Sequence, residues 1–340
     1  MVSLPQIKSL MLQATKLLKG AALADRIEIN GVPCFVLSKD PVPEVVAALK
    51  RESRRPQKVV SRLSTINESQ VSDSPEKSRR LPRKFAGAGG RYRQRDVILH
   101  ITGGGFFAHT IATDVPYLLD WSATCGAVVV CPEYALLPEH CFPVALTQVH
   151  QVYSALLNGD AVADLGFEVD KVIVTGESAG GNLAAALCTK IGSEITKLED
   201  EEPSSVGSAE FDDGVPKMPA GMMLSCAALN LSLELSLSRA IGSQDPVLPS
   251  GLISAISDAY LPVEKGFSKE DPLASPFFAS DKILQLFPPT LLFAGSTDPL
   301  LDDSVHFNER LLCLGVASEL RAAHNMPRKC IVHDPWYQFH

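Results

Sequence analysis

A serine between two glycines is the most informative feature of this sequence. Residues 176–180 read Gly-Glu-Ser-Ala-Gly, after a β-branched run at 172–175 and before a helix-favouring run at 182–187. A turn sharp enough to join a strand to a helix at Ser178 leaves no room for a Cβ two residues to either side, and glycine meets that need. Such a turn lifts the hydroxyl above the sheet and aims the N-terminus of the next helix at it, where negative charge is stabilised. The pattern predicts a nucleophile at Ser178.

A second glycine-marked loop follows another predicted strand. Residues 97–101 read Val-Ile-Leu-His-Ile, and Gly103, Gly104 and Gly105 come almost directly after them. Strand propensity does not account for three consecutive glycines, although a flexible turn would fit them if they stood alone. They suit a loop whose backbone N–H groups approach a bound group closely. Together with the N–H of Ala179, they predict an oxyanion hole beside the nucleophile.

Four ordered motifs resemble the hormone-sensitive-lipase-like branch of the α/β-hydrolase esterases. That branch carries H-G-G-G-F, Y-x-L-A-P-E-x-x-F-P-A-A, G-D-S-A-G-G-N-L and D-P-L-x-D-D. The corresponding segments here are 102–106, 134–145, 176–183 and 298–303. The resemblance covers roughly residues 95 to 327. It implies an α/β-hydrolase fold with a mostly parallel central sheet, flanking helices and an N-terminal helical contribution to a cap.

Two departures from the family pattern bear on activity. Thr102 stands where the family has a histidine, and the resemblance implies that this change loosens the oxyanion loop. The family's catalytic histidine follows a Met-Pro pair, whereas here Met326-Pro327 is followed by Arg328. Arg328 cannot act as a base because the guanidinium stays protonated. The chain ends twelve residues later, where family members continue into a C-terminal helix, so the resemblance implies a truncated C-terminus.

A serine nucleophile needs a general base, and a histidine oriented by a carboxylate is the usual solution, in the chain order Ser, Asp, His. Asp298 fits the acid by its position in the fourth motif, and Asp302 is a fallback. The histidines after it are His306, His324, His333 and His340. His306 falls in a predicted helix. His324 comes four residues before the family position and His333 comes five after it, so the base stays unassigned between these two candidates.

The elements that must position these residues alternate as in an α/β sheet. Strands are predicted at 97–101, 126–131, 172–175, 222–226, 290–295 and 318–321, and helices at 145–157 and 302–314. In open α/β sheets, ligands bind at the carboxyl ends of the strands, where Ser178, Gly103 and Asp298 all fall. Residues 248–271 are expected to supply a cap or a pocket wall.

Composition divides the chain into three regions. Residues 1–49 are predicted to form an N-terminal helical or cap region. Residues 50–95 hold fourteen Lys or Arg against four acids, with Ser, Pro and Gly clusters, and they predict a disordered linker. Residues 96–340 form the predicted catalytic core. Within it, residues 194–214 hold eight acids and one lysine and are expected to be an acidic surface loop.

Charge and cysteine usage limit the partners and the compartment. The net charge of −8 argues against nucleic acid as the main partner. The eight cysteines lack paired spacing, which suggests a reducing compartment. No C-x-x-C or H-x-x-x-H pair indicates a metal, and the predicted chemistry needs no cofactor. Without a membrane-spanning run or a signal peptide, a cytoplasmic protein is expected.

Contact with a membrane or lipid droplet stays open as an alternative. The apolar residues of the first 24 positions recur at helical spacing, which fits a membrane-surface helix as well as a cap. The basic segment at 50–95 fits docking to anionic lipid headgroups as well as a solvated linker. The sequence does not give the oligomeric state.

The sequence therefore predicts a carboxylic-ester hydrolase with a serine nucleophile and an oxyanion hole. Its expected substrate is a short or uncharged acyl ester or a neutral lipid, and its activity is expected to be impaired by Arg328. Two other interpretations stay open. A pocket with the serine and the oxyanion donors but no histidine fits a non-catalytic protein that binds a small acidic ligand. An incorrect gene model after Pro327 would also explain the unfamiliar tail.

Overall fold

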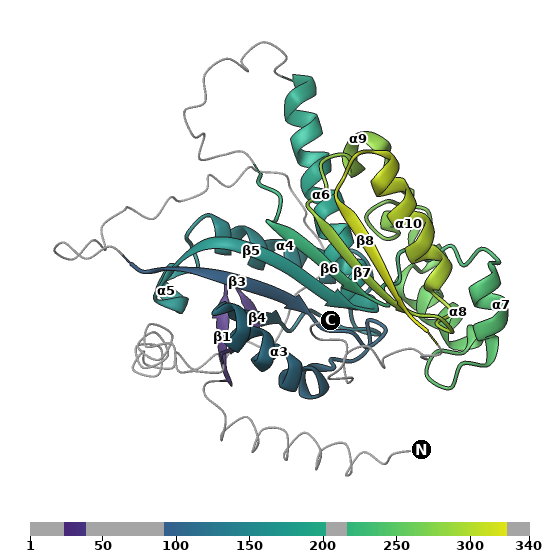
Figure 1. The fold of residues 1–340 in the computed structure, drawn as a ribbon, viewed down its shortest axis with the longest axis horizontal. Helices are drawn as coiled ribbons and strands as arrows, with labels where there is room; N and C mark the ends of the chain where they lie inside the picture. The colour runs from purple at the N-terminus through teal and green to yellow at the C-terminus, as the bar shows by residue number, and fades with distance from the viewer. Residues whose placement is uncertain (1–23, 39–91, 202–215, 325–340) are drawn as a thin grey trace, which may run out of the picture.

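The central element of the fold is an eight-stranded sheet (Figure 1). The computed structural model describes residues 24–38, 92–201 and 216–324. The strands are β1 (Ala24–Ile29), β2 (Val32–Leu37), β3 (Gln94–Ile101), β4 (Val128–Pro132), β5 (Glu168–Glu177), β6 (Gly221–Ser225), β7 (Thr290–Gly295) and β8 (Ser318–Ala323). Their order is β1-β2-β4-β3-β5-β6-β7-β8. The pairs β1–β2 and β2–β4 are antiparallel, and the remaining pairs are parallel.

Helices cover both faces of the sheet. The α-helices are α3 (Ile111–Cys125), α4 (Val144–Leu157), α5 (Val162–Leu165), α6 (Ala179–Glu201), α7 (Leu237–Ile241), α8 (Ser250–Tyr260), α9 (Asp281–Leu284) and α10 (Leu301–Cys313). Short 3-10 turns are η1 (Gly242–Gln244), η2 (Val263–Lys265) and η3 (Pro276–Phe278). On one face, α3 packs Tyr117 and Leu118 against Ile98 and Val129. On the other, α4, α6 and α10 share one core with alternate residues of the same strands.

The parallel strands are apolar because both of their faces are covered. All five residues of β4 and the last five of β3 are buried, as expected for strands that lie between two helical layers. β5 pairs with β3 on one side and β6 on the other. The turn after β5 therefore lies at the carboxyl edge of the sheet, next to the loop that follows β3. This is where ligands bind in such folds.

Residues 24–37 form a β-hairpin, whereas the sequence analysis places them in a helical region. The hairpin turns at Asn30 and Gly31, both with positive φ (48° and 83°). An Asn-Gly pair is the strongest short signal for a hairpin turn. Ile27, Ile29 and Val32 on either side of it are buried against the core. This period-two burial, together with the pairing of β2 to β4, explains the strands; the rest of 1–49 lies outside the described residues.

The beginning of the acidic segment is helical and not a loop. α6 continues to Glu201 and so includes residues 194–201 of the predicted insertion. Lys190 and Glu194 form an ion pair at 2.9 Å one turn apart, and Ile195 packs against the core. These contacts stabilise the helix, and Glu199 and Asp200 beyond them are exposed. Residues 202–214, and the predicted linker up to residue 91, lie outside the described residues.

None of the helices within the described ranges combines the length and the apolar composition needed to cross a bilayer.

Candidate active site

Ser178 occupies the tight turn between β5 and α6. Its φ of 57° lies in the left-handed region, which a residue with a side chain seldom adopts. A Cβ on Gly176 would run into the carbonyl oxygen of Gly180, and a Cβ on Gly180 would run into that of Ile101. The close approach of backbone to backbone therefore requires both glycines. Ser178 is half-buried while its neighbours in the turn are buried, so part of it stays accessible.

The loop after β6 holds the Ser178 turn in place. The N–H of Ser178 donates to the carbonyl of Ser225 at 2.9 Å, and the N–H of Ala228 donates to the carbonyl of Ser178 at 3.2 Å. The side-chain amide of Asn182 donates to the carbonyls of Ala228 and Ala274, both at 2.7 Å. Asn182 is fully buried, and losing these bonds would leave the donors of a buried amide unsatisfied. The backbone around the serine is therefore fixed by several elements.

The three glycines after β3 lie directly beside the serine. A Cβ on Gly103 would come within 3.4 Å of the Ser178 Cβ. Gly104 and Gly105 have φ values of 118° and 61°, which favour glycine. Ala179 is the first residue of α6, and a helix N-terminus stabilises nearby negative charge. The structure thus brings the predicted oxyanion loop next to the predicted nucleophile.

Aromatic side chains and backbone contacts fix both ends of the glycine loop. Phe106 stacks on Tyr260, with ring centroids 3.8 Å apart and planes 6° from parallel. The carbonyl of Phe106 accepts a hydrogen bond from the N–H of Leu137 at 2.8 Å. At the other end, the Tyr134 hydroxyl donates to the carbonyl of Thr102 at 2.8 Å. α8, which ends at Tyr260, therefore forms a wall beside the loop.

An imidazole lies against Thr102, the position at which the resembling family has a histidine. Nδ1 of His109 is 3.1 Å from the Thr102 hydroxyl, and its ring meets Tyr134 edge-on at 4.7 Å between centroids. Burial lowers the pKa of His109, and the nearby Glu133 carboxylate only partly opposes it. The ring is therefore mostly neutral at pH 7. Sequence reasoning missed this contact because it spans a loop of irregular backbone.

Asp298 lies in the turn after β7 and is fully buried. Its Oδ1 accepts the N–H of Leu300 at 2.9 Å, and its own N–H donates to the carbonyl of Gly295 at 3.1 Å. Asp302, the fallback acid, instead accepts the N–H of Ser238 at 2.8 Å. Burial raises the pKa of Asp302, but hydrogen bonds, led by that from Ser238, outweigh burial and hold the pKa below its ordinary value. These positions favour Asp298 over Asp302 as the acid.

His324 is the candidate base that the structure describes. It directly follows Ala323, the last residue of β8, and it is exposed. Ala323 is paired with Gly295 of β7, and its carbonyl accepts the N–H of Ser296 at 2.9 Å. His324 therefore leaves the sheet at the same edge as Asp298, one strand away.

The remaining histidines after Asp298 lie either on α10 or outside the described residues. His306 is exposed on α10 and lies close enough to Asp302 to lower the pKa of that carboxyl. Arg328, His333 and His340 lie outside the described residues. The assignment between His324 and His333 therefore stays a prediction.

A buried polar cluster lies behind the Ser178 turn, and the sequence analysis does not predict it. Nδ1 of His100 is 2.8 Å from the Thr175 hydroxyl, and its Nε2 is 3.4 Å from Asp114 Oδ2. The Tyr117 hydroxyl is 3.3 Å from the same Nε2. All four side chains are at most 4% exposed, so they join β3, β5 and α3 behind the site. The sequence does carry a signal for this cluster: His100 and Thr175 are polar residues inside the otherwise apolar runs that form β3 and β5.

Comparisons with known proteins agree with this geometry. The sequence profile described as the alpha/beta hydrolase fold matches residues 98–332. An esterase of Acinetobacter venetianus is 30% identical over 214 residues, which are 63% of this chain and 60% of that protein. Human hormone-sensitive lipase is 32% identical over 168 residues, which are 49% of this chain and 14% of the lipase. The chain thus spans less than two thirds of the length of either relative.

Solved structures share the fold. Carboxyl esterase 2 from Tuber melanosporum has a TM-score of 0.58 and 24% identity, over 69% of this chain and 70% of that one. An esterase of the bacterial hormone-sensitive lipase family has a TM-score of 0.62 and 20% identity, over 93% of this chain and 80% of that one. At these identities the likeness shows the fold alone.

The mostly parallel sheet, the strand–turn–helix at Ser178 and the adjacent glycine loop define an α/β hydrolase. The chain belongs to the α/β-hydrolase fold family, and hormone-sensitive lipases are among its relatives. The predicted fold class and the resemblance read from the four motifs are therefore confirmed. The predicted N-terminal cap contribution and the tail after Pro327 lie outside the described residues.

Proposed function

We propose that this chain is a serine carboxylic-ester hydrolase. The proposal depends mainly on the approach of the glycine loop to the serine, where a Cβ on Gly103 would lie 3.4 Å from the Ser178 Cβ. A nucleophile beside a glycine-rich loop at a helix N-terminus is the arrangement that acyl transfer needs. Relatives are named esterase and hormone-sensitive lipase. A short or uncharged acyl ester, or a neutral lipid, is therefore the proposed substrate.

The chemistry follows from these positions. The Ser178 hydroxyl attacks the ester carbonyl carbon while its proton passes to the general base. The carbonyl oxygen becomes an oxyanion, which the N–H groups of Gly104, Gly105 and Ala179 stabilise. Collapse of this intermediate releases the alcohol, which takes the proton from the base. Water activated by the same base then hydrolyses the acyl-serine, while Asp298 orients and stabilises the protonated base.

We further propose that this activity is impaired, because Arg328 stands at the family's histidine position. His324 and His333 are the candidates that would supply a base instead. An oxyanion hole and substrate binding alone leave about 10³-fold to 10⁴-fold acceleration over water when a triad member is missing. Turnover is therefore expected to be low but measurable.

The nucleophile assignment is tested by a fluorophosphonate probe and a short-chain p-nitrophenyl ester. Ser178→Ala should abolish labelling, because no other side chain is proposed to attack the carbonyl, and should leave at most the residual turnover that an oxyanion hole and substrate binding supply. Ser254→Ala is the matched control, since Ser254 is an exposed serine on α8. Labelling that persists in Ser178→Ala would remove this assignment.

The impairment is tested by restoring the base. Arg328→His should raise turnover roughly tenfold or more, since an imidazole would stand where the family has one. His324→Ala and His333→Ala are measured alongside. If the unmodified chain already turns over like an ordinary esterase and one of these two changes silences it, the impairment is rejected and the base is assigned.

Arg328 also favours a second candidate function, non-catalytic binding of a small acidic ligand. A cation at the histidine position would attract a carboxylate toward the oxyanion loop. Calorimetric titration with a short-chain carboxylic acid separates the two functions. Binding without any Ser178-dependent turnover would favour the binding protein. A cytoplasmic location, and lipid contact through residues 1–49 and 50–95, stay predictions from the sequence.

A further inference from the structure

One loop joins the two halves of the proposed catalytic centre. Residues 226–239, called here the bridging segment, run from the end of β6 into α7. At the first end, Ala228 donates its N–H to the carbonyl of Ser178 at 3.2 Å and accepts a hydrogen bond from the Asn182 side chain at 2.7 Å. This end of the bridging segment is therefore attached to the turn that carries the proposed nucleophile.

The other end of the bridging segment is attached to the turn that carries Asp298. Ser238 donates its N–H to Asp302 Oδ2 at 2.8 Å, and the N–H of Asp302 donates to the Ser238 hydroxyl at 3.2 Å. The same hydroxyl donates to the carbonyl of Pro299 at 3.1 Å. Gly242, just beyond, packs so closely that a Cβ there would lie 3.0 Å from the Cα of Pro299. The residue after Asp298 is thus held by α7 and the turn that follows it.

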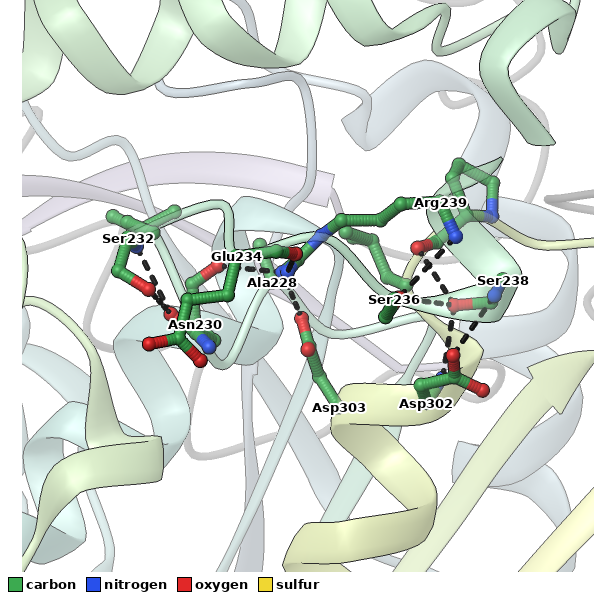
Figure 2. A network of polar contacts seen from close by, with 12 residues as sticks. Ala228, Asn230, Ser232, Glu234, Ser236, Ser238, Arg239, Asp302 and Asp303 are labelled. Carbon is green, nitrogen blue, oxygen red and sulfur yellow. Dashed lines mark hydrogen bonds and ion pairs between the residues drawn. The ribbon is translucent and has the colours of Figure 1, made fainter. Parts of the chain in front are cut away.

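Arg239 holds the middle of the bridging segment against α10 (Figure 2). Its side chain is 8% exposed, and its guanidinium donates to the carbonyls of Glu234 and Asn230, the latter at 3.0 Å. It also donates to the Asp303 carboxylate at 2.6 Å. Asp303 lies in the first turn of α10, directly after the Asp298 turn. One side chain therefore fixes the shape of the bridging segment and the place of the helix that follows the acid.

We propose that Arg239 is a positioning residue for the catalytic centre: it sets the distance and orientation between Ser178 and Asp298 by holding the bridging segment to both turns. The inference rests on the proposed function, which gives those two residues their roles. The planar guanidinium makes all three contacts at once, whereas a lysine ammonium is a compact point charge that cannot span them. Removing the Arg239 guanidinium would also leave the buried Asp303 carboxylate without its positively charged partner.

Arg239→Lys is the direct test, measured in the chain itself and in the Arg328→His background. kcat for a short-chain p-nitrophenyl ester should fall by about tenfold to a hundredfold, with KM changed by less than about threefold, because a small misplacement of a catalytic group acts mainly on the transition state. The acid limb of the pH–rate profile should move to lower pH, because the base loses part of its interaction with the Asp298 carboxylate. A merely structural role would not move that limb.

Arg310→Lys is the matched control. Arg310 lies on α10 and, like Arg239, donates to two carbonyls and one carboxylate: those of Phe277 (2.6 Å), Ala279 (2.9 Å) and Asp281 (2.6 Å). These contacts lie at the end of α10 that is remote from the acid turn. Arg310→Lys should keep kcat within about twofold of the parent. If both variants lose kcat equally, or if Arg239→Lys keeps kcat and the same pH profile, the inference is overturned.

Hydrogen exchange gives a readout that does not depend on turnover. The N–H of Ala228 donates to the Ser178 carbonyl, and the N–H of Leu300 donates to Asp298 Oδ1. In Arg239→Lys, the amides of Ala228 and Leu300 should both exchange faster than in the parent, whereas in Arg310→Lys both should stay protected. Unchanged protection at either amide overturns the inference whatever the turnover. Absence of Ser178-dependent turnover in both backgrounds would instead overturn the proposed function, and the exchange data would still decide whether Arg239 couples the two turns.

Ser238→Ala keeps the inference testable if Arg239→Lys does not fold. This change removes only one hydroxyl, which contacts Pro299 and Asp302. The loss in kcat should be about threefold to tenfold, with the same movement of the acid limb and the same faster exchange at Leu300. A Ser238→Ala variant with the parent's kcat, pH profile and protection would overturn the inference.

Discussion

At the scale of single residues, the contact between Thr102 and His109 bears most directly on the predicted oxyanion loop. The two side chains meet at 3.1 Å, while the Thr102 carbonyl is held by Tyr134. The position that carries a histidine in the resembling family is thus in contact with an imidazole supplied from seven residues later. Since the glycines lie between the two contacting residues, this hydrogen bond closes the loop on itself.

We expect His109→Ala and Thr102→Val each to lower kcat by about fivefold, with little change in KM. A net hydrogen bond contributes about 1 kcal/mol, and a looser loop weakens donors that act on the transition state. Steady-state kinetics on a p-nitrophenyl ester measure the effect, and His140→Ala, at an exposed histidine, is the control. The double variant should lose no more than either single one. Fully additive losses would show that the two side chains act independently.

Residues differ in how far the sequence could predict them. The tight turn at Ser178, with Gly176 and Gly180 around it, was predictable because the strand, turn and helix that form it are contiguous. Arg239 was not, because its carboxylate partner Asp303 is 64 residues away and nothing local distinguishes a buried arginine from an exposed one. The base was not predictable either, since Arg328 occupies the position at which the resembling family has its histidine.

At the scale of elements, the carboxyl ends of the parallel strands place the residues of the candidate site. β3, β5 and β7 deliver the glycine loop, Ser178 and Asp298 to one edge of the sheet. The apolar, β-branched runs made these strands predictable. The hairpin at 24–37 was missed, although Asn30-Gly31 is a recognisable turn signal, because its strands are short and mixed in polarity. The end of α6 was missed because a run of acids gives no strong helix signal.

The Ser178 turn tolerates no side chain at Gly180. A Cβ there would overlap the carbonyl of Ile101 and lie 2.6 Å from that of Thr102. Gly180→Ala should therefore lower the free energy of unfolding by about 2 kcal/mol or more, measured by urea denaturation. Gly251→Ala is the control because nothing lies within 4 Å of its Cβ position in α8. That change should be neutral or stabilising by about 0.5 kcal/mol; equal stability of the two variants would show that the turn can relax.

At the scale of the whole molecule, the proposed nucleophile Ser178 and the proposed acid Asp298 follow β5 and β7, which lie on opposite sides of β6. The loop that follows β6 contacts both turns, so the sheet alone does not set their separation. Polar groups behind the site, His100 with Asp114 on one face and Arg239 with Asp303 at the edge, are nearly fully buried. Of these groups, the Asp303 carboxyl, whose pKa is raised by burial, makes the stability of the fold depend on pH.

Asp303 gives that dependence a definite sign. Burial raises its pKa from 3.8 to about 7, although the Arg239 guanidinium pulls the pKa down. Between these values the folded chain binds more protons than the unfolded chain. Its contribution to stability is therefore fully present below about pH 4 and is lost as pH rises toward 7. Asp302, whose pKa is lowered, acts in the opposite sense and only below about pH 4, because its stabilising effect is lost as the carboxyl becomes protonated.

Asp303→Asn should remove the pH-dependent contribution of this carboxyl to the stability of the fold. The free energy of unfolding of the parent, measured by urea denaturation from pH 4.5 to 7.5 (roughly the interval between the two pKa values), should fall relative to that of Asp303→Asn as pH rises. Asp281→Asn, at an exposed carboxylate paired with Arg310, should instead give a curve parallel to the parent's, because exposed ion pairs contribute little. If the parent and Asp303→Asn curves run parallel, Asp303 keeps its charge across this range, and the 2.6 Å contact with Arg239 outweighs the effect of burial.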